Sequence, residues 1–181
     1  MPTVVNNKPE NVKLGVCSVT FDTTDLGFTK GGVQVAVATT THEVTVDQLG
    51  NTPINELIMG RTCTVTVPLA ETTLENLVAT MPGATMIVDA TDPTKRYVKV
   101  PTAAGKNLLS FAKTLVLHPK DKADTDRSDD FTVFKAATAG AITYSYSLDN
   151  ERIFNVEFKA YPDADNDNEL FAVGDTTAVN L

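Results

Sequence analysis

Alternation of apolar and polar side chains dominates the chain and predicts a protein built mainly from β-strands. Period-two runs include "VQVAVAT", "THEVTVDQ", "TCTVTVPL", "FAKTLVLH", "FTVFKAA", "ITYSYSL" and "FNVEFKAY", and such runs are typical of strands buried on one face. "VKLGVCSVTF" also alternates, but its apolar face changes near Val16 and Cys17, as it does at a β-bulge. The 27 threonines and 21 valines suit a pleated surface. We expect about eight or nine strands.

Helical spacing occurs clearly in one segment, residues 72–81. Its apolar residues recur at i, i+3, i+4 and i+7, the stripe of a helix that lies on a sheet: Leu74, Leu77, Val78 and Met81. Thr72 followed by Glu75 has the spacing of a capping box, and the Pro-Gly pair that follows ends the helix. Many strands and one amphipathic helix predict a mainly β fold, an antiparallel sandwich or barrel with a flanking helix.

The length of 181 residues fits a single domain spanning 1–181. Residues 1–11 are polar and contain two prolines, so we expect an N-terminal arm. Residues 119–130 are almost entirely charged and predict a solvated loop between strands. Residues 162–181 begin polar but regain apolar side chains, which favours a C-terminal arm that docks on a partner through Leu170, Phe171 and Val173.

An apolar cluster lies in the predicted connection between two strands, where loops are normally polar. It comprises Ile54, Leu57, Ile58 and Met59. Either this connection folds back onto its own sandwich, or another copy of the chain covers it. Valine- and threonine-rich strands with few charges, such as 33–39 and 62–67, would aggregate if they were left at an open sheet edge. Closing the sheets across subunits removes such edges, although a self-closed barrel does the same.

The chain has 15 basic and 23 acidic residues and a formal net charge of −8. This balance argues against a nucleic-acid-binding protein, because Lys and Arg supply most of the affinity for phosphate. No apolar run reaches the roughly 18 residues of a membrane helix. The first residues, "MPTVVNNKPE", lack the pattern of a secretory signal. Cys17 and Cys63 lie in apolar runs, which favours two reduced thiols in a protein made in the cytoplasm.

The sequence offers few groups for catalysis. His42 and His118 are the only histidines, and no nucleophile motif accompanies them, so we expect two structural histidines and a protein that is not an enzyme. "DADNDNE" matches the first three positions of a calcium loop, but Asn168 and Gly174 stand where glycine and glutamate are needed. An acidic turn is the better interpretation, and we expect no metal and no cofactor.

Residues 26–77 carry a resemblance to a known family. The segment "LGFTKGGVQVAV…THEVTVDQLGNTPINELIMGRTCTVTVPLAETTLENL" contains a glycine-bearing entry, "E-V-x-V-D-Q-x-G-x-T-P", an apolar connection ending in glycine, an alternating strand and the start of the helix. In that order and spacing it resembles the tail tube (major tail) proteins of long-tailed bacteriophages. The second half of the chain carries no diagnostic motif of this family and matches it in expected architecture alone.

The resemblance implies a tail-tube-like β-sandwich that forms hexameric rings, whose inner sheets join into one barrel. The rings would stack around a tape-measure protein within a virion tail, contact tail terminator and baseplate or tail-tip proteins, and let genomic DNA pass a negatively charged lumen during ejection without specific binding. It also implies that the apolar connection reaches onto a neighbouring subunit or ring. Together with the C-terminal pattern, this leads us to expect subunit contacts at these residues: Asp47, Gln48, Leu49, Ile54, Leu57, Ile58, Met59, Leu170, Phe171 and Val173. Alternatives are a virion surface module for host recognition, a type VI secretion-like tube subunit and a small hydrolase.

Overall fold

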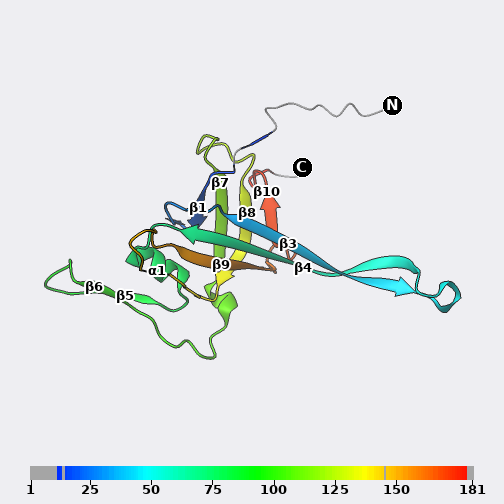
Figure 1. The fold of residues 1–181 in the computed structure, drawn as a ribbon, viewed down its shortest axis with the longest axis horizontal. Coiled ribbons are helices and arrows are strands. Elements are labelled where there is room, and N and C mark those ends of the chain that lie inside the picture. The colour runs from blue at the N-terminus through cyan, green and yellow to red at the C-terminus, as the bar shows by residue number, and fades with distance from the viewer. Residues whose placement is uncertain (1–11, 14, 145, 179–181) are drawn as a thin grey trace.

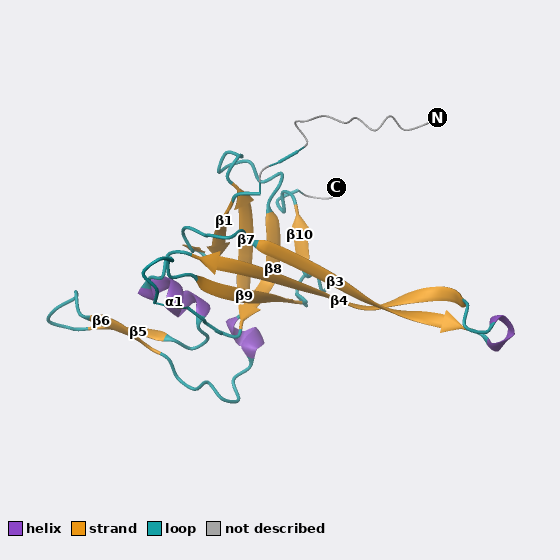
Figure 2. Ribbon diagram, viewed as in Figure 1, coloured by secondary structure: helices purple, strands orange, loops and turns teal. Residues whose placement is uncertain are grey.

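The computed structural model describes residues 12–13, 15–144 and 146–178, so the expected arm 1–11 lies outside the described residues. Antiparallel strands form most of the described chain (Figures 1 and 2). The strands are β1 (Cys17–Phe21), β2 (Thr24–Asp25), β3 (Gln34–Thr45), β4 (Pro53–Leu69), β5 (Thr85–Val88), β6 (Arg96–Lys99), β7 (Lys113–Pro119), β8 (Phe131–Thr138), β9 (Phe154–Tyr161) and β10 (Phe171–Val173). The helices are α1 (Leu74–Thr80) and two 3-10 turns, Asp47–Leu49 and Leu108–Phe111.

Eight of the strands form one antiparallel sheet. Its order is β2-β1-β7-β8-β9-β4-β3, with β10 paired to β8, and β5 and β6 make a separate hairpin. The sheet does not close, because β2 and β3 lie at its two ends. The prediction of a mainly β, antiparallel fold with one flanking α-helix is confirmed, and the barrel alternative is excluded for the described residues.

The sheet folds over on itself to enclose the core. Phe21 on β1 and Phe158 on β9 have ring centroids 4.9 Å apart, although β7 and β8 separate their strands within the sheet. In Figure 1, β1, β7, β8 and β10 run steeply across the direction of β3, β4 and β9. The two halves therefore face each other as the layers of a sandwich. Alternate positions of both halves fill the space between them: Val19, Val65, Val67, Leu115, Val133 and Val156.

Helix α1 (Leu74–Thr80) is shorter than the predicted 72–81, and its N-cap lies one residue later than the predicted Thr72. Thr73 is the N-cap, and its side chain accepts a hydrogen bond from the backbone N–H of Asn76 at 3.2 Å. The predicted capping box at Thr72 is therefore wrong, because the Thr72 hydroxyl accepts hydrogen bonds from Arg152 instead. The Asn76 side chain is buried and donates to the carbonyl oxygens of Leu26 and Glu71, each at 2.9 Å. These bonds fix α1 to the chain on both sides of β3 and β4.

We expected residues 162–181 to form an arm, but the part up to Val173 packs on the body. Strand β10 pairs with β8, and Phe171 stacks on Phe131 with ring centroids 5.0 Å apart. The segment that leads to β10 is closed by paired backbone between Asp163 and Glu169. Burial of the Phe171 ring against the chain's own sheet explains why the apolar residues return after the polar run.

Three other strand predictions differ from the structure. The segment "ITYSYSL" forms no strand in its described residues, because Tyr144 and Tyr146 pack on each other and on Arg152. The runs at 33–39 and 42–48 belong largely to a single strand, β3. The apolar connection at 49–60 is mostly strand as well, because β4 begins at Pro53.

Candidate interaction surface

Strands β3 and β4 continue beyond the sheet as a projecting hairpin, which we call the ribbon (residues 39–61). Their pairing runs from Gln34 opposite Thr66 to Thr45 opposite Pro53, whereas β9 pairs with β4 only over 64–69. Residues 53–63 therefore have one neighbouring strand, and at about 3.3 Å per residue they span roughly 35 Å. Figure 1 shows the ribbon leaving the body along the longest axis of the molecule.

Two register shifts and a short helical turn shape the ribbon. The shifts fall between Thr40 and Thr41 and between Val44 and Thr45, and such irregularities bend and twist a strand pair. The connection at the tip is the 3-10 turn Asp47–Leu49, followed by Gly50 with a φ of 61°. The true loop is therefore much shorter than the predicted one.

The ribbon exposes most of the residues that the sequence assigns to subunit contact. Ile54, Leu57, Ile58 and Met59 are 52%, 52%, 62% and 69% exposed, and Leu49 at the tip is 56% exposed. Asp47 and Gln48 are exposed beside them. The alternative in which this segment folds back onto its own sandwich is wrong, since no described part of the body buries these side chains.

The three C-terminal residues of the predicted contact set lie elsewhere. Phe171 is half-buried against β8, and Leu170 is also half-buried, while Val173 is 70% exposed. The structure therefore brings the seven residues between Asp47 and Met59 together on the ribbon and separates them from β10.

Apart from Arg61 at its base, all charged side chains of the ribbon are acidic. They are Glu43, Asp47 and Glu56. Glu43 lies directly opposite Glu56 in the strand register, an arrangement that destabilises a strand pair. The only side-chain hydrogen bond to either carboxylate within the described chain comes from Thr41, whose hydroxyl donates to Glu56 Oε1 at 2.5 Å. The ribbon thus presents apolar side chains and uncompensated negative charge together.

Strand β3 also leaves a long sheet edge unpaired. Among the described strands, β3 has β4 as its one neighbour over all 12 of its residues. Its first eight residues, "QVAVATTT", carry no charge and no proline, two of the features that commonly prevent edge-to-edge pairing.

A histidine–carboxylate pair, which the sequence analysis did not find, lies at the end of β7. His118 Nδ1 is 2.6 Å from Asp130 Oδ1, and both side chains are largely buried. Nε2 of His118 is buried and has no hydrogen-bond partner in the described chain. A catalytic base needs a nucleophile at this nitrogen, and none of the described side chains supplies one. His42, in contrast, is exposed on β3.

In the acidic turn that resembles a calcium loop, the carboxylate of Asp163 is bound by donors of the protein itself. Asp163 accepts hydrogen bonds from the backbone N–H of Asp165 at 3.2 Å and from the Asn166 amide at 2.8 Å, and it pairs with Lys135 Nζ at 2.6 Å. The hydrogen bond from Lys135 is the main reason that the pKa of Asp163 is lowered. No cluster of three or more metal-ligating side chains occurs among the described residues.

The two cysteines are free thiols. Cys63 is buried on β4 and Cys17 is half-buried on β1, and burial raises the pKa of both thiols. A raised thiol pKa lowers nucleophilicity, so neither cysteine is a good catalytic candidate.

A second exposed cluster lies on the loop before β9. The Arg152 guanidinium is 5.5 Å from the ring centroid of Tyr144 and 5.3 Å from that of Tyr146, and it donates to the Thr72 hydroxyl at 2.6 and 3.0 Å. A hollow of about 350 Å³ adjoins Tyr146 and Arg152. This cluster could not be recognised in the sequence, because the alternation of "ITYSYSL" favours a strand.

Comparisons with known proteins do not identify the chain: no family model matches the sequence, and no curated protein matches it. Within the described chain, no helix has the length and apolar character needed to cross a membrane.

Proposed function

We propose that this chain is a structural, non-enzymatic subunit of a hollow tube of the bacteriophage tail type. Hexameric rings of the subunit stack in the virion tail and form a conduit for genomic DNA. The sequence resemblance over residues 26–77 supports this proposal, and so do the antiparallel sandwich, the projecting ribbon and the open edge of β3.

The exposed ribbon is the observation that carries the proposal. Large exposed apolar surfaces on monomeric proteins mark interaction sites, and both faces of the ribbon expose apolar side chains, because Leu57 and Ile58 are consecutive paired positions. An isolated two-stranded hairpin is marginally stable at best in water. A projection of this length with Ile54, Leu57, Ile58 and Met59 exposed therefore favours a chain whose working state includes a neighbour that covers the ribbon.

The sheet edge supports a ring in particular. An edge strand of 12 residues whose first eight carry no charge is suited to pairing with another sheet, and closing sheets around a ring leaves no edge open. A ring also suits the charge of the chain. Six copies at −8 each give −48, and a negatively charged wall keeps DNA away from the surface over about 8 Å at physiological salt.

Electron microscopy and native mass measurement of the concentrated protein test this proposal. We expect hollow rings or stacked tubes and hexamers. In Ile58→Asp an unpaired charge enters a dry contact, at a cost of several kcal/mol, so assembly should be lost while the monomer still unfolds cooperatively. Leu148→Asp is the matched control, because Leu148 is fully exposed in a loop outside the ribbon.

Each result decides a separate point. A wild-type protein that stays monomeric at high concentration would overturn the tube. Rings that persist in Ile58→Asp would exclude the ribbon as a contact, and a mutant that unfolds would place Ile58 in the core of its own subunit.

A virion surface module for host recognition is the second candidate, favoured by the exposed cluster of Tyr144, Tyr146 and Arg152. Aromatic and arginine side chains are enriched at recognition sites. This function predicts a monomer or a small discrete oligomer that binds host surface sugar or protein and loses binding in Tyr146→Ala. Native mass separates it from a tube subunit.

A further inference from the structure

Charge is segregated between two segments of the chain. Between Lys30 and Arg61 the charged groups are the acids Glu43, Asp47 and Glu56, whereas 93–120 contains six lysine and arginine residues and no acid. The acidic segment forms the ribbon. The basic segment runs through β6, the 3-10 turn Leu108–Phe111 and β7.

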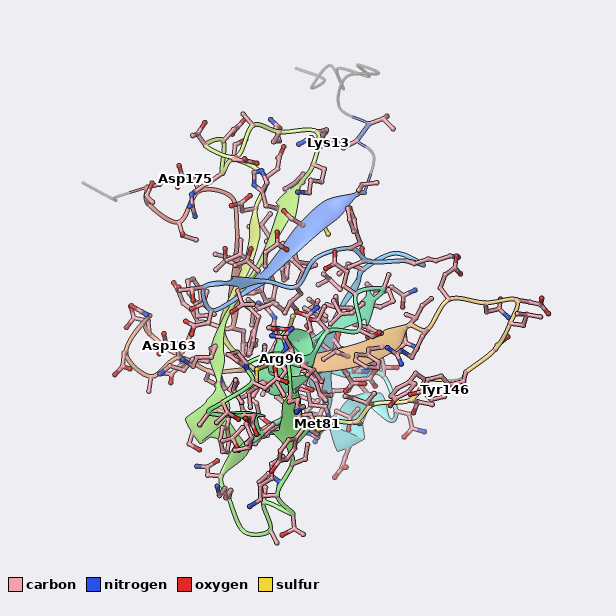
Figure 3. The ribbon with its side chains drawn as sticks, turned by 90° about the vertical axis from the view of Figure 1, so that its left-hand side faces the viewer. Lys13, Met81, Arg96, Tyr146, Asp163 and Asp175 are labelled. Carbon is pink, nitrogen blue, oxygen red and sulfur yellow. The ribbon has the colours of Figure 1, made fainter. Side chains whose placement is uncertain are left out.

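The ribbon and the β6 part of the basic segment lie on opposite sides of the molecule, whereas β7 lies within the body (Figure 1). In Figure 1 the ribbon extends to one side along the longest axis, and the β5–β6 hairpin extends to the other. Figure 3 looks onto the end that carries β5 and β6, with Arg96 near the centre and Met81 below it. We call this surface, formed by β5, β6 and residues 100–111, the basic end.

The basic end combines hollows with two lysines that are unpaired within the described chain, Lys99 and Lys106, while Lys95 and Arg96 are paired with Asp92 and Glu75. Two adjoining hollows of about 330 and about 400 Å³ share Met81, Pro82 and Phe111 in their lining. Lys106 Nζ lies 5.9 Å from the ring centroid of Phe111. Among the described residues, no carboxylate lies within ion-pair distance of Lys99 or Lys106.

We propose that the basic end of one copy is the surface that receives the ribbon of a second copy. This proposal rests on the proposed tube function and names the partner surface of its principal contact. Residues Glu43, Glu56 and Ile58 lie on one face of the ribbon, because their register positions alternate with the residues of the other face. Ile58 enters the hollows, and the two carboxylates face Lys99 and Lys106.

The two surfaces are complementary both in apolar character and in charge. Apolar side chains on the ribbon meet hollows that the body leaves unfilled, and burial of apolar area stabilises association. The opposed carboxylates of Glu43 and Glu56 repel each other in a free subunit, and lysines of a neighbour compensate this repulsion. Opposite potentials across an interface also exclude wrong orientations.

Such a contact joins two different surfaces, so each copy can bind one neighbour through its ribbon and another through its basic end. Contacts of this head-to-tail kind make closed rings when the rotation closes and open filaments when it does not. The contact therefore propagates from copy to copy rather than stopping at a dimer.

Zero-length crosslinking of assembled wild-type protein tests the pairing directly. A carbodiimide joins a carboxylate to a lysine only when the two are in contact. We expect crosslinked peptides that connect Glu43 or Glu56 to Lys99 or Lys106. Because the ribbon projects away from the body, which carries Lys106 beside Phe111, and from the β5–β6 hairpin, which carries Lys99, such a crosslink identifies a contact between copies.

Charge reversal provides the second test. Glu56→Lys alone and Lys106→Glu alone should each raise the concentration needed for assembly about tenfold or more, and the chain that carries both changes should recover most of this loss, as paired charges do in double-mutant cycles. Lys120→Glu is the control. Lys120 is an exposed lysine of the same basic segment, but it follows the last residue of β7 and lies outside the basic end.

The outcomes separate this proposal from the tube itself. If wild-type protein assembles but gives none of these crosslinks, and Lys106→Glu assembles like the control, the basic end is not the receiving surface and the tube still stands. If wild-type protein does not assemble, the tube proposal fails first. Recovery in the doubly reversed chain, with no recovery in a chain that carries Glu56→Lys and Lys120→Glu, supports the pairing.

Discussion

Glu43 lies directly opposite Glu56 where β3 and β4 pair beyond the sheet. Opposed like charges weaken a strand pair, and neither β9 nor any other strand of the described residues supports this part of the ribbon. The free subunit therefore carries a local source of instability at the place where we infer that a neighbour binds.

Glu56→Gln should stabilise the ribbon in the monomer, because it removes the repulsion and keeps an oxygen that accepts the Thr41 hydrogen bond. Hydrogen exchange of the dilute subunit should slow across 41–58, whereas assembly should weaken. Asp47→Asn is the control, since it removes the same charge at the tip where no acid stands opposite. Equal slowing in both variants would mean that net charge matters and the Glu43–Glu56 pairing does not.

The packing of Phe21 on Phe158 predicts which aromatic residues stabilise the fold. Phe158→Ala should lower the free energy of unfolding by roughly 3–5 kcal/mol, the usual cost of deleting a buried phenylalanine. Phe28→Ala should change it by less than about 0.5 kcal/mol, because Phe28 is 79% exposed. Urea denaturation measures both. A small effect of Phe158→Ala would contradict the contact between the two halves of the sheet.

Much of the fold follows from local alternation. Buried residues recur at every second position of β4 and β9, as at Val65, Val67 and Val156, and one-face burial of this kind can be recognised in a sequence. The helix is also local, because the stripe of residues between Leu74 and Val78 needs nothing distant to define it. Its N-cap was misplaced by one residue because Thr72 and Thr73 are adjacent and both can cap.

Features that depend on distant partners could not be predicted in the same way. The tyrosine run alternates like a strand, but Arg152 holds Tyr144 and Tyr146 outside the sheet. His118 and Asp130 stand 12 positions apart, and their contact depends on the return of the chain from β7 to β8. The apolar cluster around Ile58 could be recognised, but its place on a projecting strand rather than in a loop depends on the register of β3 and β4.

The N-cap of α1 gives a prediction that distinguishes two adjacent threonines. Thr73→Ala should lower the free energy of unfolding by roughly 0.5–2 kcal/mol, because the Asn76 N–H loses its acceptor at the start of the helix. Thr73→Ser should retain most of the stability, since a serine hydroxyl can accept the same bond. Thermal or urea unfolding is the measurement. Equal loss in Thr73→Ala and Thr73→Ser would show that the methyl group, rather than the cap, stabilises this turn.

The loop between β7 and β8 predicts a contribution to stability that depends on pH. Hydrogen bonds from Ser128, followed by Lys122, lower the pKa of Asp126 from 3.8 to about 2. The folded state therefore holds this carboxylate ionised at a pH where the unfolded chain already binds a proton. Its stabilising effect is complete above the unfolded pKa and is lost as pH falls through the folded pKa.

Asp126→Asn should consequently reduce the dependence of the unfolding free energy on pH between about pH 4 and about pH 2, and the wild type and the variant should converge at the acid end of this window. Urea denaturation at a series of pH values gives the slope for each protein. Asp121→Asn is the control, because it removes a carboxylate from the same loop that has no side-chain hydrogen bond or ion pair in the described structure. A wild-type slope retained in Asp126→Asn would show that the Ser128 and Lys122 bonds do not persist in solution.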